Sequence, residues 1–200
     1  MMIGYFCQGW TGWLYVTWMP SLFAKNYGMD LKKSSLFYMV TLLCAMLAEF
    51  LGGLSTDYLL RRTGSLAIAR SGLVGASWVL AVVSLVPAIF VHEAVIGVIA
   101  FTFALFFLGF AISPIWTATV DVAPDYAGSA SALMNMAGAV AGILSPLAFG
   151  WILDRTGSWT APFSVSLCLL LLGAVVTFWF RPDRPIHAIP LPAVQPRARA

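Results

Sequence analysis

Six runs of mostly apolar residues, each about 20 residues long or longer, take up most of this 200-residue sequence. An α-helix needs roughly 20 such residues to cross the hydrocarbon core of a bilayer. The runs therefore predict six transmembrane helices joined by short segments that hold most of the charged residues. The predicted helices have the approximate bounds 3–23, 35–54, 66–90, 94–120, 130–153 and 161–180.

The low charge of the sequence supports a membrane protein over a soluble one. Only 10% of the residues are charged and 60% are hydrophobic, whereas about a quarter of a soluble domain is charged. The net charge of +3 is spread along the chain, and no basic stripe with interleaved aromatic residues indicates a nucleic-acid partner. We therefore expect an all-α protein whose surrounding partner is the lipid bilayer.

Catalytic, metal and channel signatures are absent from the sequence. Cys7, Cys44 and Cys168 each fall inside an apolar run without metal-ligand or disulfide spacing, so we expect small packing residues and no cofactor. An intramembrane serine protease needs a histidine base inside the bilayer, but His92 lies in a predicted loop and His187 in the C-terminal tail. Water-channel Asn-Pro-Ala and selectivity-filter sequences are also missing. The sequence predicts that the protein is not an enzyme.

The distribution of Lys and Arg predicts the orientation in the membrane. With six spans, one side of the membrane holds the N-terminus, the second and fourth loops and the C-terminal tail. This side carries the excess of basic residues. We therefore expect both termini in the cytoplasm, in a plasma or inner membrane. Residues 182–200 are rich in Pro and Arg without an apolar period, which predicts a disordered cytoplasmic tail after a bundle formed by residues 1–181.

A short sequence pattern occurs twice. Gly-x-x-x-Asp is found at Gly53–Asp57 and at Gly150–Asp154, and Arg-Thr-Gly follows at 62–64 and at 155–157. The copies end the second and fifth predicted spans, which run in opposite directions. This pattern favours two three-helix units with inverted topology. Alternatively, the residues recur because they make favourable helix ends.

The first copy is also a candidate gating element. Glycine near the end of a span allows another helix to approach closely, and the carboxylate can pair with neighbouring arginines or accept hydrogen bonds at a helix start. A charged loop of this kind can latch two helix bundles together and release them. The alternative is an interfacial loop that obeys the positive-inside rule. The residues of the candidate loop are Gly53, Asp57, Arg61, Arg62 and Gly64.

This run resembles the loop signature between the eighth and ninth helices of the major facilitator superfamily. Further segments in the same order resemble the anion:cation symporter family within it, and the segment at 116–124 reads Trp-Thr-Ala-Thr-Val-Asp-Val-Ala-Pro. The other segments are 18–20, 126–128, 131–135, 138–146 and 149–159. The resemblance covers residues 1–181 and corresponds to helices seven to twelve of a twelve-helix transporter.

The resemblance implies a fold and a function. The fold is half of a major facilitator fold, with six transmembrane helices as two inverted three-helix repeats. The function is secondary transport of a small organic anion such as a sugar acid, by symport with a proton. Because the first six helices are not in this sequence, the expected partner is an N-terminal six-helix half or a second copy in a homodimer. The alternative is a transporter-derived fragment that does not transport alone.

Two ionisable residues, Glu49 and Arg70, fall inside predicted spans. Such residues are costly in lipid and are therefore candidates for function. Glu49 lies eight residues before Asp57, which places it about 12 Å deeper along a helix. The sequence leaves two interpretations open: a proton-coupling or gating carboxylate, or a structural ion pair between Glu49 and Arg70.

Polar residues inside the spans are candidates for the wall of a substrate cavity. Gln8, Thr11 and Tyr15 have the spacing of one helical face, and the resemblance implies that the first and fourth spans line the cavity. No span has a basic residue at mid-depth to bind an organic anion, so the resemblance assigns that cation to the N-terminal half. The candidates are Gln8, Thr11, Tyr15, Ser113, Trp116, Thr117 and Asn135.

Overall fold

The computed structural model describes residues 1–25, 27–90 and 93–186, most of which lie in helices. Two of the elements are short: a π-helical turn, η1, and a 3₁₀ turn, η2. The elements in chain order are α1 (Met2–Lys25), α2 (Leu31–Thr63), η1 (Ala67–Gly72), α3 (Leu73–Phe90), α4 (Ala94–Phe110), α5 (Ile112–Val122), η2 (Pro124–Tyr126), α6 (Ala127–Thr156) and α7 (Thr160–Trp179).

The prediction of an all-α membrane protein is confirmed, with one difference in the first span. Within the described residues, five helices are long and apolar enough to cross a membrane: Lys32–Thr63, Ala67–Pro87, Ala94–Val122, Pro124–Thr156 and Thr160–Trp179. Helix α1 has 24 residues, which is long enough, but Gly, Trp, Tyr, Thr and Gln alternate with its apolar residues and lower its hydropathy. Its packing explains this composition.

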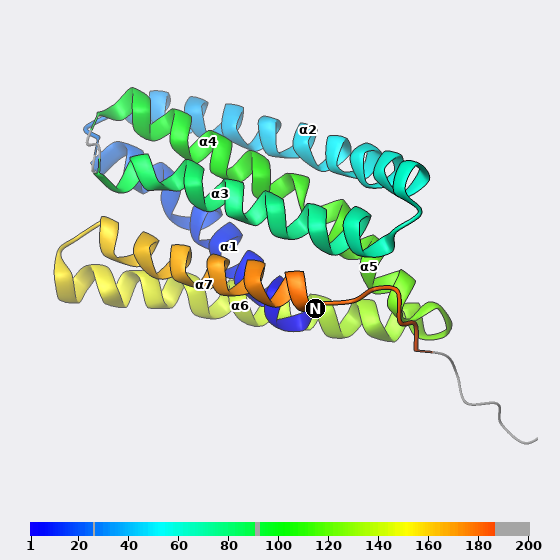
Figure 1. Cartoon of the computed structure of the whole chain (residues 1–200). Coiled ribbons are helices and arrows are strands. Elements are labelled where there is room, and N and C mark those ends of the chain that lie inside the picture. Colours follow the sequence, from blue (N-terminus) through cyan, green and yellow to red (C-terminus); the bar gives the residue numbers. More distant parts are fainter. Residues whose placement is uncertain (26, 91–92, 187–200) are drawn as a thin grey trace, which may run out of the picture.

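Helix α1 lies inside the bundle (Figure 1). It packs mainly against α6 and α7, while α2 packs against α4, and α3 packs against both α4 and α7. Figure 1 shows α2, α3 and α4 on one side of α1 and α6 and α7 on the other. Because α1 faces protein over much of its surface, it can carry polar and small residues that a lipid-facing helix could not.

The N-terminus and the end of α7 lie at the same end of the bundle (Figure 1). Met1, Arg70 and Phe180 line one small cavity there. We call this end, which also holds Arg61 and Asp121, the arginine end. The placement of both helical termini at one end agrees with an even number of passes through the membrane.

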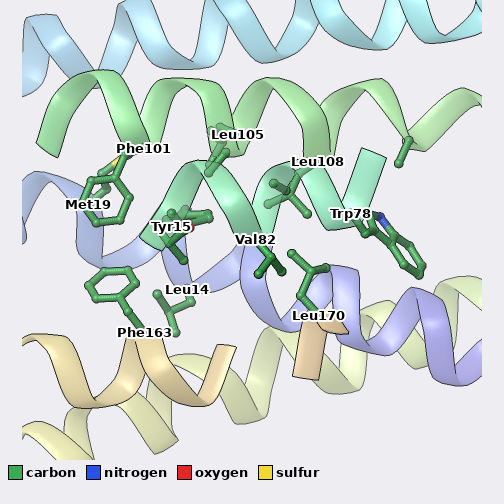
Figure 2. Packing of buried hydrophobic residues seen from close by; sticks show 14 of the residues in the cluster. Leu14, Tyr15, Met19, Trp78, Val82, Phe101, Leu105, Leu108, Phe163 and Leu170 are labelled. Atoms are coloured by element: carbon green, nitrogen blue, oxygen red, sulfur yellow. The ribbon is translucent and has the colours of Figure 1, made fainter. Parts of the chain in front are cut away.

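The buried core lies where α1, α3, α4 and α7 meet (Figure 2). Tyr15 of α1 is fully buried, and its ring centroid is 5.5 Å from that of Phe101 and 5.9 Å from that of Phe163. Large apolar side chains elsewhere, such as Leu43 and Leu172, are exposed on the outer faces of α2 and α7. Apolar side chains on the outer faces of the helices are what a lipid environment favours.

Helix α2 contacts the α4–α5 segment through its backbone. Pro114 has no N–H to donate to the carbonyl of Phe110, and the helix is interrupted at Ala111. Gly52 of α2 lies against this interruption, where a Cβ atom would collide with the carbonyl group of Phe110. A Cβ atom on Gly109 would likewise come within 2.5 Å of the carbonyl oxygen of Ala45. Glycine at both positions lets the two backbones touch.

The structure places only the beginning of the predicted C-terminal tail. Residues 187–200 lie outside the described residues, so the prediction of disorder there stays a prediction. Pro182 is buried, and the backbone N–H of Ile186 donates to the carbonyl of Val122 at 2.7 Å. The chain after α7 therefore lies against the end of α5.

Candidate functional site

A groove of about 470 Å³ opens between α1, α2, α4, α5 and α6. No charged side chain lines it among the residues that the structure describes. Three glycines of α1 and α6, Gly9, Gly12 and Gly138, widen it, and aromatic rings of α1 form much of its wall. The lining residues are Tyr5, Gln8, Gly9, Gly12, Trp13, Val16, Leu42, Ala45, Leu105, Leu108, Gly109, Ile112, Asn135, Gly138 and Ala139. We call this the central groove.

Two amide side chains, Gln8 and Asn135, provide most of the polar chemistry of the central groove. Gln8 is 6% exposed, and its Nε2 donates to the carbonyl of Leu108 at 3.1 Å. Its Oε1 is a buried acceptor without a hydrogen-bond partner among the described residues. Asn135 is exposed on α6. An unsatisfied buried acceptor is costly, so a donor from a bound molecule would be stabilising at Gln8.

The structure does not place Thr11 and Tyr15 in the groove beside Gln8. The Thr11 hydroxyl donates to the carbonyl of Cys7 within α1, and Tyr15 is buried in the aromatic core. The spacing of these residues predicts a shared side of the helix, but not which neighbours that side contacts. Gln8 lies where the buried side of α1 meets the groove, and Thr11 and Tyr15 lie deeper in the bundle.

The polar residues of α5 also lie outside the groove lining. The Ser113 hydroxyl donates to the carbonyl of Glu49 at 3.1 Å and joins α5 to α2. The Thr117 hydroxyl donates to the carbonyl of Ser113 in its own helix. Trp116 packs edge-on against Tyr5 with ring centroids 5.8 Å apart. Trp116 therefore does not line the groove itself but packs against Tyr5, which does. Tyr5 is not among the cavity residues that the sequence predicts.

The prediction of a charged loop after the second span is wrong in one respect. Helix α2 does not end before these charged residues but remains helical through Thr63. Arg and Lys are good helix formers and are favoured near a helix C-terminus, so the charges mark the end of the apolar run and not the end of the helix. The helix stops at Gly64, which has φ 66° and donates its N–H to the carbonyl of Leu60. Glycine adopts this left-handed conformation without strain.

Arg70 joins three elements at the arginine end. Its side chain is 6% exposed, and its Nε lies 2.8 Å from Oδ2 of Asp121, at the end of α5. Its Nη1 lies 3.7 Å from Oδ1 of Asp57 and donates to the Thr56 hydroxyl at 2.7 Å. The Thr56 hydroxyl in turn donates to the carbonyl of Ala69 at 2.5 Å. We call Arg70, Asp57, Asp121 and Thr56 the arginine clamp.

The predicted ion pair between Glu49 and Arg70 is not formed. The carboxylates that Arg70 contacts are those of Asp121 and Asp57, and Glu49 has no ion-pair partner in the part of the chain that the structure describes. Asp121 lies just beyond the fourth predicted span, which has the bounds 94–120. Its position at the same end of the bundle as Arg70 was the signal that could have identified the pair.

Arg61 and Arg62 are exposed on the last turns of α2. The Arg62 Nη1 donates to the Tyr58 hydroxyl at 2.6 Å, and the guanidinium lies 5.9 Å from the centre of that ring. The Arg61 Nε donates to the carbonyl of Asp57 at 3.4 Å. Both contacts are made within α2, which leaves these two side chains outside the arginine clamp.

Comparisons with known proteins agree with this architecture. The sequence pattern of the Major Facilitator Superfamily matches residues 1–146. The chain is 36% identical over 177 residues to a probable sulfoacetate transporter, SauU, of Cupriavidus necator, which covers 88% of this chain and 41% of that protein. It is 33% identical over 159 residues to a probable galactarate/D-glucarate transporter, GudP, of Escherichia coli K12, covering 78% of this chain and 34% of the relative.

A plant relative is similar over the same region. The chain is 29% identical over 181 residues to a chloroplastic ascorbate transporter of Arabidopsis thaliana, covering 88% of this chain and 32% of the relative. The chain thus spans between about a third and two fifths of the length of these relatives. The relatives are transporters, and their names are those of transporters of organic anions.

Proposed function

Because this multi-pass membrane chain belongs to the Major Facilitator Superfamily, we propose that it forms one half of a secondary transporter for a small organic anion such as a sugar acid, moved by proton symport. The observation that carries the proposal is the central groove, an uncharged recess with an unsatisfied amide oxygen at Gln8. The names of the relatives support an anionic substrate.

The side chains of the central groove favour a hydroxylated acid as the substrate. The Gln8 and Asn135 amides can hydrogen-bond to hydroxyl groups, and the rings of Tyr5 and Trp13 offer apolar faces to the carbon skeleton. Among the described residues, the groove lining has no cation for the carboxylate. That cation is proposed to come from a facing six-helix half, supplied either by a separate N-terminal half or by a second copy of this chain.

Helix pairing supports the proposed inverted repeat of three helices each. In such a repeat, α1 corresponds to the α4–α5 segment, α2 to α6, and α3 to α7. The packing of α2 against α4 then corresponds to the packing of α6 against α1. The packing of α3 against α4 corresponds in the same way to that of α7 against α1. The ends of α2 and α6 also agree. Gly64 and Gly157 have φ values of 66° and 65°, and each donates its N–H at 2.8 Å to a leucine carbonyl four residues earlier.

We propose a gating role for the end of α2. Asp57 is 59% exposed although it contacts Arg70, and the exposed Arg61 and Arg62 can reach the facing half. The excess of arginine at this end favours the cytoplasmic side of a plasma membrane for both termini. A latch here would close the cytoplasmic side of the groove in one state and release it in the other.

Uptake of labelled sugar acids into cells that express this chain tests the proposed function. The assay is run with and without a co-expressed N-terminal six-helix half of a related transporter. We expect proton-dependent uptake of galactarate only when both halves are present. Uptake by this chain alone would indicate a homodimer, and no uptake in either case, with the protein located in the membrane, would favour an inactive fragment.

Replacing Gln8 with methionine is expected to weaken binding of galactarate in the two-half transporter. Loss of one hydrogen bond of about 1 kcal/mol corresponds to a roughly fivefold increase in the half-saturating concentration. Thr11→Val is the matched control, because the hydrogen bond of the Thr11 hydroxyl in the described part of the chain is made to Cys7 within α1. Equal half-saturating concentrations for the Gln8→Met variant and the unmodified protein would exclude Gln8 from the substrate site.

A further inference from the structure

Glu49 lies near the middle of α2, far from both ends of the helix. It is 16 residues after Lys33 and 12 residues before Arg61, which places it about 24 Å from one and about 18 Å from the other at the rise of an α-helix. The hydrocarbon core of a bilayer is about 30 Å thick. Glu49 is therefore at a depth where a charged side chain is expensive unless it is paired or lies in a water-filled cavity.

The structure removes the pairing that would have made Glu49 a structural residue. Arg70 contacts Asp121 and Asp57 instead, and Glu49 is exposed on the surface of the bundle without an ion pair among the described residues. The backbone at this point is fixed, because the Ser113 hydroxyl bonds to the Glu49 carbonyl. The side chain is thus held at mid-depth with no ion-paired cation beside it among the described residues.

Glu49 lies next to the central groove. Leu42 and Ala45 of α2 line the groove, and Glu49 continues their helical face one turn further. Tyr5 lines the same groove from α1. A carboxylate in this place can exchange protons with water in the groove without entering lipid.

The other elements that pack against α2 provide few charged or titratable groups near Glu49. Helix α4 has none. Helix α5 has Asp121, eight residues beyond Ser113, and η1 has Arg70, which is bound to it. From α1, Tyr5 is the titratable residue among the described residues that line the groove. Within α2 the nearest charged residue is Asp57.

We propose that Glu49 is a proton-binding residue of the transport cycle. Its carboxylate takes up a proton from one aqueous side, becomes a neutral carboxylic acid while the groove is closed to water, and releases the proton to the other side. This inference rests on the proposed transport function and goes beyond it, because it places a coupling proton in this half of the transporter and assigns it to one side chain.

Glu49→Gln tests the proposal, because glutamine resembles the protonated acid and cannot release a proton. Proteoliposomes with this chain and its six-helix partner are assayed for uptake driven by a pH gradient and for exchange of labelled for unlabelled galactarate at equal pH. We expect at least a tenfold loss of gradient-driven uptake with exchange retained. Glu93→Gln, the other glutamate of the sequence, should retain both activities, and Glu49→Asp should retain gradient-driven uptake.

Each remaining outcome is informative. If Glu49→Gln shows the same gradient-driven uptake as the unmodified protein, the role proposed for Glu49 is overturned and the proposed transport function stands. Loss of exchange together with uptake would make Glu49 a structural partner of the facing half and would also overturn it. If the unmodified protein transports nothing, the proposed function fails. Infrared spectra of the carboxylic-acid band then test the role of Glu49 separately. A band that changes with pH in the unmodified protein and is absent from Glu49→Gln would support the inference. No such band in the unmodified protein would overturn it.

Discussion

Replacing Arg70 with methionine is expected to lower the free energy of unfolding in mixed micelles by about 3–5 kcal/mol. Arg70 is nearly fully buried and joins η1 to α2 and α5. Methionine has a similar length and no charge, so the variant leaves the carboxylate of Asp121, which is 28% exposed, without its cation. The loss of one partner of a buried ion pair is far more destabilising than the loss of both.

Two comparisons separate the ion pair from general packing effects. The double variant Arg70→Met/Asp121→Leu should recover part of the stability lost by Arg70→Met, because it removes the unpaired charge as well. Asp121→Asn should cost more than Asp57→Asn, since Asp121 lies 2.8 Å from Arg70 and Asp57 lies 3.7 Å away and is largely exposed. An Arg70→Met variant within 0.5 kcal/mol of the unmodified protein would contradict the arginine clamp.

Gly52→Ala is expected to separate α2 from the α4–α5 segment. The new methyl group would lie 2.9 Å from the carbonyl carbon of Phe110 and still closer to its oxygen. These are backbone atoms that cannot rotate away, so the cost should reach the upper part of the 1–3 kcal/mol range for overpacking, or exceed it. The free energy of unfolding and the amount of folded protein in the membrane both measure this effect.

The adjacent glycine provides the matched control. A methyl group on Gly53 would lie 3.5 Å from the Ser113 hydroxyl oxygen, which is an ordinary contact, and alanine is about 1 kcal/mol more favourable than glycine in a helix. Gly53→Ala is therefore expected to be neutral or slightly stabilising. If Gly52→Ala and Gly53→Ala have the same effect, the backbone contact between α2 and Phe110 is not what holds these helices together.

The hydrophobic runs predicted the number and order of the long helices but not their ends. The second run stops near residue 54, whereas α2 extends to Thr63, because Asp57, Arg61 and Arg62 leave the apolar layer without leaving the helix. Charge marks the membrane boundary, and the left-handed glycine at position 64 marks the helix boundary. The sequence contains both signals, and the charges alone do not give the end of the helix.

Side-chain partners were harder to predict than helices. The carboxylates that Arg70 can reach depend on the direction in which its side chain leaves the helix axis. Arg70 lies in the π-helical turn η1, where the number of residues per turn differs from that of an α-helix. For α1, a spacing of three and seven residues correctly grouped Gln8, Thr11 and Tyr15 on related positions of the helix. It could not show that α4 and α7 would enclose Tyr15 while Gln8 remained at the groove.

The central claim is that the central groove binds the substrate, and chemical modification of Gly12→Cys tests it most directly. Gly12 lines the groove, and a Cβ atom there meets no atom within 4 Å.

In a variant without Cys7, Cys44 and Cys168, we would measure the rate at which a polar thiol reagent modifies this cysteine in open membrane fragments that also contain the six-helix partner. Thr63→Cys, exposed at the end of α2, is the control. The account predicts that galactarate slows modification at position 12 severalfold and leaves position 63 unchanged. Equal rates at position 12 with and without galactarate, in a preparation that transports it, would place the substrate elsewhere and contradict the account.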